Sequence, residues 1–258
     1  MCLILLSYDM HADNSLIVAA NRDEYYDRPT GPLAFWREAP HVLAGRDIRG
    51  GGTWLGITCQ GRIAALTNFR DPSAIRGDAP SRGLLVRNFL EGTDSPPVYL
   101  ERIRKNAHKY NPFSLLLGDR SGLFYHSNRN DEIRQLESGL YGLSNHLLDT
   151  PWPKVQKGKD SLENLIKTKK RVSPEDIFDI LSDRSFPPGQ LLPDTGVGSA
   201  WERLLSPVFI TSRIYGTRSA AALIVNRTGR ITVAERSFPP RAEGIDRYST
   251  RTFRLMLT

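Results

Sequence analysis

The sequence has little cysteine, no long hydrophobic run and none of the common nucleotide-binding or serine-nucleophile motifs. Only two of its 258 residues are cysteines, which excludes a disulfide framework and is typical of a reducing compartment. No apolar run approaches the roughly 18 residues of a transmembrane helix. The apolar start, residues 2–6, is shorter than the core of a signal peptide. We therefore expect a cytoplasmic protein without a transmembrane segment.

Several kinds of binding site are also missing. Neither G-x-x-x-x-G-K-[ST] nor G-x-S-x-G occurs, which excludes a P-loop and a serine-hydrolase elbow. The five histidines and two cysteines lack the spacing of metal ligands, so we expect no metal site and no required cofactor. The net charge is +7, but the basic residues are scattered. Such a distribution does not predict nucleic-acid binding, although it is compatible with a small anionic ligand.

The apolar pattern predicts blocks of short strands separated by two pairs of helices. Strands are expected at residues 2–8, 15–21, 53–58, 62–68, 113–118, 123–126, 139–145, 207–212, 217–226, 230–235 and 248–257. Helices are expected at 81–91, 97–108, 154–169 and 173–181, and a loop at 186–200. Hairpin blocks alternating with helix pairs favour an α+β fold, a four-layer αββα sandwich of two mainly antiparallel sheets. Because no linker, repeat or low-complexity tract divides the chain, we expect one domain, residues 1–258.

The first predicted hairpin returns the chain start to the end of its second strand. Cys2 would then lie beside the cluster Asn21-Arg22-Asp23-Glu24. If Met1 is removed, Cys2 carries a free α-amine with a pKa of about 7.7–8.0, which can take the proton of its own thiol. One residue would supply both nucleophile and base. The alternative is that Cys2 is a small apolar residue on a buried strand.

The charged cluster has two interpretations. A carboxylate of Asp23 could orient the terminal amine, and the Arg22 guanidinium could favour the thiolate or hold an anionic substrate group. Equally, the two residues could form a structural ion pair at a strand end. We expect Glu24 to face solvent or support the next loop, and Asn21 to cap the turn or supply an amide donor.

Three further polar residues are candidates for a catalytic site. Asn68 and Asn145 each end a predicted strand, where a side-chain amide can serve as an oxyanion donor, although Asn is also common in turns. Arg218 stands at the head of an apolar strand, either as a clamp for a substrate anion or as a surface charge.

Besides Asn21 and Glu24, which are also candidates for ligand binding, two further candidates complete the set. Gly50-Gly51-Gly52 could let the backbone approach a ligand, with Trp54 as a wall of the site. His146 follows Asn145 and is the one histidine that we include, with a structural role as its alternative.

Several blocks of the sequence closely resemble the NRDE family, the homologues of transport and Golgi organisation protein 2. Met1-Cys2 is followed by the run from Ala19 to Pro29, which contains Asn-Arg-Asp-Glu. Similar blocks continue in order at residues 51–56, 65–68, 141–145, 150–152, 215–218 and 235–237. The resemblance therefore covers nearly the whole chain.

The NRDE family in turn resembles N-terminal-nucleophile hydrolases of the choloylglycine hydrolase and penicillin V acylase kind. That resemblance implies an αββα fold with Cys2 as nucleophile, supported by Arg22 and Asp23. It also implies oxyanion or nucleophile-orienting roles for Asn68 and Asn145. Arg218 would correspond to the site arginine that those hydrolases carry late in the chain. The pattern departs at one point, because those hydrolases place an Asp three residues after the Arg, where this chain has Tyr25, so either Asp23 or Glu24 must take its place.

Two functions follow as hypotheses. The first is a cysteine amidohydrolase or acyltransferase that cleaves a linear, non-peptide amide C–N bond or transfers an acyl group through an acyl-enzyme at Cys2. The second is a non-catalytic trafficking protein that binds haem, acyl-CoA or a similar anionic lipid-like ligand in the same place. The more distant resemblance to the hydrolases implies the first. The eukaryotic members of the NRDE family are associated with haem trafficking and with lipid or acyl-CoA handling, which implies the second.

Overall fold

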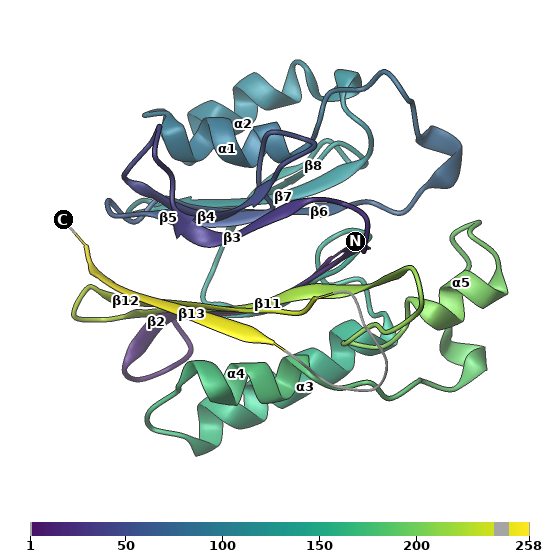
Figure 1. Cartoon of the computed structure of the whole chain (residues 1–258). Helices are drawn as coiled ribbons and strands as arrows, with labels where there is room; N and C mark the ends of the chain where they lie inside the picture. Colours follow the sequence, from purple (N-terminus) through teal and green to yellow (C-terminus); the bar gives the residue numbers. More distant parts are fainter. Residues whose placement is uncertain (1, 240–247, 258) are drawn as a thin grey trace. The chain divides into compact units, whose positions relative to one another are not determined.

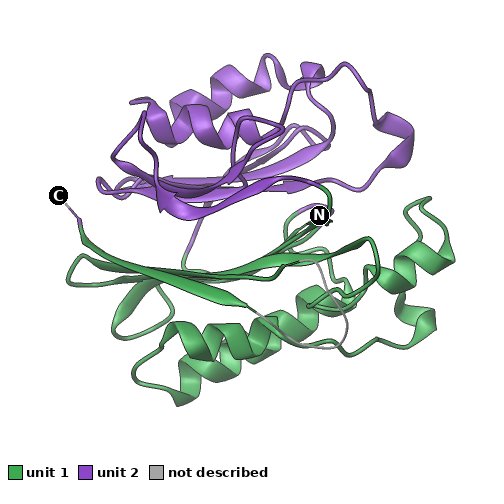
Figure 2. Cartoon of the chain, viewed as in Figure 1, with its two compact units in different colours: residues 1–27, 138–144, 148–256 green, residues 28–137, 145–147, 257–258 purple. Residues whose placement is uncertain are grey.

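The computed structural model describes residues 2–239 and 248–257, and these residues form two compact units. Unit 1 contains residues 1–27, 138–144 and 148–256, and unit 2 contains residues 28–137, 145–147 and 257–258 (Figure 2). The sequence predicted one domain, because its composition shows no linker. The chain crosses between the units at several points, so no single segment separates them, yet each unit has its own sheet and core.

Unit 1 is built on a six-stranded antiparallel sheet with the strand order β10-β1-β2-β11-β12-β13. Its strands are β1 (Cys2–Tyr8), β2 (Asn14–Tyr25), β10 (Gly139–Leu143), β11 (Tyr215–Asn226), β12 (Arg230–Ser237) and β13 (Ser249–Met256). The predicted hairpin of β1 and β2 is confirmed, and β2 extends past the predicted end through the charged cluster.

Helices α3 (Pro153–Thr168) and α4 (Pro174–Leu181) lie along one face of this sheet (Figure 1). Leu3 and Leu5 of β1 and Ile17 and Ala19 of β2 belong to one buried core with these helices. Helix α4 begins with a capping box between Ser173 and Asp176, as its sequence predicts. A shorter helix that was not predicted, α5 (Ser199–Leu204), begins at the end of the expected loop 186–200.

Unit 2 has a seven-stranded antiparallel sheet with the order β3-β4-β5-β6-β7-β8-β9. Its strands are β3 (Thr30–Phe35), β4 (Val42–Asp47), β5 (Leu55–Thr58), β6 (Ile63–Asn68), β7 (Phe113–Asp119), β8 (Gly122–Ser127) and β9 (Ile133–Leu136). Helices α1 (Gly83–Glu91) and α2 (Pro96–Arg104) cover one face, and their apolar side chains share a core with β4, β6, β7 and β8.

The predicted elements differ from the structure at identifiable places. Strands β3, β4 and β9 were not predicted; β3 contains Gly31 and Pro32 and shows a register shift between Gly31 and Ala34. It is an edge strand, where a proline is tolerated because no ladder hydrogen bond is lost. The strand predicted at residues 207–212 is wrong, since that segment makes only an isolated bridge from Thr211 to Gly216. Among the described residues no helix is long and apolar enough to cross a membrane.

Candidate active site

Cys2 and Arg22 are direct cross-strand partners in unit 1. The register of β1 and β2 pairs the two residues, and on its other side Arg22 is paired with Ser219 of β11. Paired residues in antiparallel strands carry their side chains on the same face, with Cβ atoms about 5 Å apart. The hairpin therefore brings the predicted nucleophile and the predicted cation together, as the sequence indicated.

The alternation of side chains along a strand separates the charged cluster into two sets. Leu3 and Leu5 face the helices, so Cys2 and its partner Arg22 face the other side of the sheet. Glu24 shares the face of Arg22, and its carboxylate lies 3.9 Å from the Arg22 guanidinium. Asn21 and Asp23 face the helices. Glu24, which was expected to face solvent or support the loop, is thus the carboxylate on the face of Cys2.

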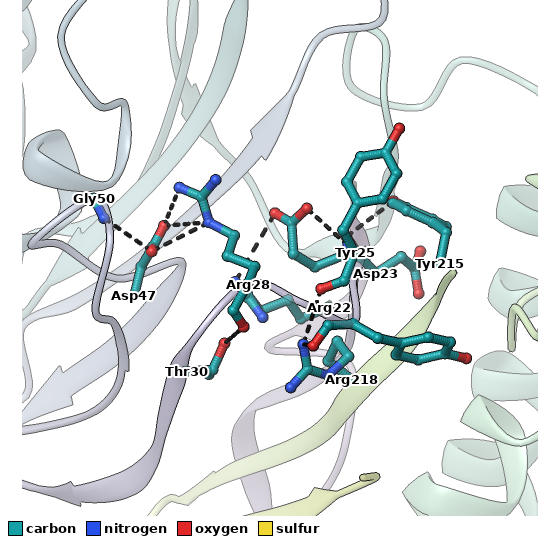
Figure 3. A network of polar contacts seen from close by, with 11 residues as sticks. Arg22, Asp23, Tyr25, Arg28, Thr30, Asp47, Gly50, Tyr215 and Arg218 are labelled. Atoms are coloured by element: carbon teal, nitrogen blue, oxygen red, sulfur yellow. Dashed lines mark hydrogen bonds and ion pairs between the residues drawn. The ribbon is translucent and has the colours of Figure 1, made fainter. Parts of the chain in front are cut away.

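Asp23 is fully buried on the helix-facing side of the sheet. Its Oδ1 accepts a hydrogen bond of 2.7 Å from the Thr217 hydroxyl. Its carbonyl oxygen accepts one of 2.9 Å from the Tyr215 hydroxyl (Figure 3). Burial raises the pKa of Asp23, while the positive charge of Lys154 and the Thr217 hydrogen bond act in the opposite direction. The carboxylate is therefore hydrogen-bonded to β11, and the charge of a residue in α3 acts on it.

Asn21 is an internal anchor of the strand end. Its side-chain amide donates to the carbonyl oxygens of Leu181, at the end of α4, and of Val208, both at 2.9 Å. The side chain is buried, with 1% of its surface exposed. The predicted roles were a turn cap or an amide donor to a ligand. In the structure the side-chain amide donates to two backbone carbonyl oxygens of the protein instead.

Arg218 lies at an irregularity of β11. The register of β11 against β2 shifts between Thr217 and Ser219, so Arg218 is the extra residue of a bulge, a feature that re-aims a side chain. Its guanidinium donates to the carbonyl oxygens of Tyr25 and Tyr26, at 2.9 and 3.2 Å (Figure 3). Burial lowers the pKa of Arg218, and the nearby charge of Arg22 lowers it further. Ser219, the next residue in β11, is paired with Arg22, so the two arginines stand at the same end of the sheet.

The thiol of Cys2 is partly buried. Burial raises its pKa, and the charge of Asp23 adds to this, whereas the charge of Arg22 lowers it. The Ser144 hydroxyl donates to the carbonyl oxygen of Cys2 at 3.2 Å and so ties the start of β1 to the end of β10. In this state of the chain the thiol form of Cys2 is favoured over the thiolate.

Asn68 and Asn145 belong to unit 2 and lie together there. The Asn145 side chain is fully buried and donates to the carbonyl oxygen of Asn68 at 2.9 Å. The Arg70 amide donates to the carbonyl oxygen of Asn145 at 2.7 Å. One amide donor of Asn145 thus holds the end of β6, and the oxyanion roles of both residues stay predictions.

His146 also belongs to unit 2. Its ring lies 4.5 Å from the ring of Phe69, and its carbonyl oxygen accepts a hydrogen bond from the Ser114 hydroxyl. Burial lowers the pKa of His146, which favours its neutral form. These contacts fit the structural alternative and leave its ligand-binding role a prediction.

The glycine block before Trp54 has a packing role. A Cβ built at Gly52 would lie 2.2 Å from the carbonyl carbon of Gly83, at the start of α1. The Asp47 carboxylate accepts a hydrogen bond of 3.0 Å from the Gly50 amide and two from the Arg28 guanidinium (Figure 3). The close backbone approach that the glycines predicted is therefore made to a helix of unit 2. Trp54 is partly buried, and its carbonyl oxygen accepts the Leu66 amide at 2.9 Å, so its role as a ligand wall stays a prediction.

The sequence analysis missed three residues around Asp23. Tyr215 and Thr217 donate to it, and Lys154 acts on its charge from the first turn of α3. Tyr215 and Thr217 stand in the block around Arg218, where the alternation of β11 could have indicated them. Among residues 2–239 and 248–257, no cluster of three or more His, Cys, Asp or Glu side chains could hold a metal ion.

Solved structures similar to this chain include a mutant of the conjugated bile acid hydrolase from Clostridium perfringens. It aligns with 100% of this chain and 98% of its own, with a TM-score of 0.50 and 11% identity. The likeness shows the fold and confirms the predicted class, an α+β fold with two antiparallel sheets of the kind found in N-terminal-nucleophile hydrolases, the αββα class.

Similarity in sequence identifies the family as well as the fold. Over 281 residues the chain is 32% identical to the Transport and Golgi organization 2 homolog of Mus musculus, covering 100% of this chain and 99% of the relative. It is 34% identical over 278 residues to the Homo sapiens homolog, with the same coverage of both chains. The family model for Transport and Golgi organisation 2 matches residues 1–240. The chain therefore belongs to the Transport and Golgi organisation 2 family.

Proposed function

We propose that this protein is a cysteine amidohydrolase or acyltransferase of the N-terminal-nucleophile type, with Cys2 as its nucleophile. The pairing of Cys2 with Arg22 on one face of the sheet, at the end where the chain begins, carries the proposal. A fold shared with a bile acid hydrolase supports it. The proposal names a non-peptide amide or an activated acyl compound as the substrate class.

The reaction begins once Met1 has been removed, which converts the amide nitrogen of Cys2 into a free α-amine. This amine takes the thiol proton, and the thiolate attacks the carbonyl carbon of the substrate. The C–N bond breaks, the leaving amine receives the proton, and the acyl group remains on Cys2 as a thioester. Water, or an acceptor amine or alcohol, then attacks the thioester and returns the thiol.

Arg22 and Glu24 have complementary roles in this proposal. Burial disfavours the Cys2 thiolate, so a cation on the same face is needed to lower the thiol pKa, and Arg22 has that effect. Glu24, 3.9 Å from Arg22, restrains the guanidinium at the strand end. In this proposal Arg22 stabilises the developing negative charge, and Glu24 orients Arg22.

The proposal is tested by intact-mass measurement on the natural, untagged protein. We expect the mass without Met1, and incubation with p-nitrophenyl octanoate should add one octanoyl group, which peptide mapping locates on Cys2. The reactive ester is used because it acylates a competent nucleophile whatever the natural leaving group is. Retention of Met1 on the natural protein, or acylation spread over surface lysines with Cys2 unmodified, would reject the proposal.

A second function is favoured by one observation. Arg22 is paired with Ser219, the neighbour of Arg218 in β11, so both cations stand at the same end of the sheet, and the charge of Arg22 lowers the pKa of Arg218. Like charges held near each other suit an anion that bridges them. We infer as the alternative a non-catalytic carrier of haem, acyl-CoA or a similar anionic amphipathic ligand, in which Cys2 is a thiol ligand or a wall of the site.

The carrier hypothesis predicts a loss of affinity when either cation is removed. Titrations of ferric haem and of palmitoyl-CoA should give a Kd at least tenfold higher for Arg22→Ala and Arg218→Ala than for the unmodified chain. The exposed Arg213 provides the matched control, and Arg213→Ala should bind as the unmodified chain does. Thermal unfolding of each variant separates lost binding from lost folding. Equal affinities in all variants would exclude these cations from a ligand site.

A further inference from the structure

Lys154 is a buried cation that the proposed reaction has not used. It is the second residue of α3, and only 4% of its surface is exposed. Its ammonium group donates to the carbonyl oxygen of Leu205, just past α5, at 3.0 Å. The hydrogen bond to a neutral carbonyl does not by itself offset the cost of burying a charge. An opposite charge nearby is therefore expected on physical grounds.

The contacts of Leu205 lead to Asp23. Leu205 packs in a small buried cluster with Ile210 and Tyr215. The Tyr215 hydroxyl donates to the carbonyl oxygen of Asp23, and the Ile210 amide donates at 2.9 Å to the same Thr217 hydroxyl that donates to the Asp23 carboxylate. These contacts connect the start of α3, the end of α5 and the start of β11 to the end of β2 that carries Asp23.

The surrounding charges make Lys154 the cation on the helix-facing side. Arg22 lies on the opposite face of β2, where it is paired with Cys2. On α5 the carboxylate of Glu202 is buried and accepts hydrogen bonds from the amide and hydroxyl of Thr195. Of the charges acting on Asp23, that of Lys154 has the largest effect in lowering its pKa against burial.

We propose that Lys154 is a positioning residue that keeps the Asp23 carboxylate ionised beneath the strand end that carries Arg22 and faces Cys2. An ionised Asp23 accepts hydrogen bonds and holds the ends of β1, β2 and β11 in register at the place where the α-amine of Cys2 would be freed. This inference deepens the proposed function, and the role of Lys154 in the reaction rests on that function. The buried pair itself can be tested without the reaction.

The first test measures the coupling between the two charges. Lys154→Met, Asp23→Asn and the double variant form a cycle in which the unfolding equilibrium constant is measured in urea. Removing the cation raises the folded-state pKa of Asp23 further above its unfolded value, so the penalty of Lys154→Met grows as the pH rises through that range. At pH 8 we expect the effects of the two substitutions on the unfolding equilibrium constant to be coupled by at least tenfold, and this coupling should shrink towards pH 4. Lys167→Met, at an exposed position of the same helix, should show no coupling to Asp23→Asn. Coupling below twofold at pH 8 would overturn the buried pair.

The second test follows acylation of Cys2 by p-nitrophenyl octanoate as a function of pH. A nearby cation favours the ionised carboxylate. In Lys154→Met, the fall of the acylation rate on the acid side of the pH profile (the acid limb) should therefore shift to higher pH by at least one unit, and the rate should return to that of the unmodified chain at higher pH. Lys154→Arg should restore the original limb, which a loss of folding would not do. An unmoved limb in Lys154→Met overturns the positioning role. If the unmodified chain is not acylated at all, the proposed function fails and the role in the reaction fails with it, while the coupling cycle decides the charge pair separately.

Discussion

Replacing Cys2 with alanine is expected to abolish acylation by p-nitrophenyl octanoate at the N-terminal residue. Alanine keeps the small volume of the side chain but removes the only atom that can form the thioester in the proposed reaction. Cys2→Ser should retain an adduct at a rate lower by roughly three orders of magnitude, because a hydroxyl is far less ionised than a thiol near neutral pH. Stopped reactions analysed by intact mass give both rates.

The second cysteine of the chain provides the matched control. Cys59 is also partly buried and belongs to unit 2, so Cys59→Ala tests whether any accessible thiol would react. We expect Cys59→Ala to be acylated at the rate of the unmodified chain. If Cys2→Ala were acylated normally and Cys59→Ala were not, Cys59 would be the reactive thiol and the assignment of Cys2 would be wrong.

Replacing Gly52 with alanine is expected to cost roughly 3 kcal/mol of the free energy of unfolding. The added methyl group would lie 2.2 Å from the carbonyl carbon of Gly83 and 2.4 Å from its oxygen, so one backbone segment must move. The Thr53 amide donates to the Gly83 carbonyl oxygen at 3.2 Å, and that movement would also disturb this contact. For a chain of this size the midpoint of thermal unfolding should fall by roughly 10 °C.

Gly77→Ala is the matched control for this prediction. A Cβ at Gly77 meets nothing within 4 Å, and its backbone does not require glycine. We expect its unfolding midpoint to stay within about 2 °C of the unmodified chain, since such surface changes are usually within 0.5 kcal/mol. Equal midpoints for Gly52→Ala and Gly77→Ala would show that the loop and α1 separate at little cost, contrary to the packing described.

For the glycines before Trp54, the sequence correctly predicted a close approach of the backbone but assigned it to a ligand instead of another part of the chain. Three consecutive glycines before Trp54 indicated a close approach of the backbone to something, and a ligand was the natural candidate. The structure shows that the approach is made to the start of α1, about thirty residues later in the chain. No local pattern distinguishes a ligand from a second backbone segment, because both require only the absence of a side chain.

The charged cluster shows a similar limit. Adjacent residues of a strand point to opposite faces, so Arg22 and Asp23 could have been separated as soon as β2 was predicted to continue through them. Which of the two shares a face with Cys2 required the register of β1 against β2. Which face is covered by helices required the packing of Leu3 and Leu5. The NRDE motif therefore supplies an arginine and a glutamate to one face and an aspartate to the other.

The sequence by itself determined the family, the three blocks of strands, the two helix pairs and the return of Cys2 to Arg22, because alternation, caps and short turns act between near neighbours. Only the tertiary structure decided which faces the charged side chains occupy and that Asp23 is held by Thr217, 194 residues away. Lys154 likewise reads as an ordinary exposed helix residue until α3 is packed against the sheet. Such contacts join segments far apart in the chain, and their free energy depends on burial, which no local pattern of residues records.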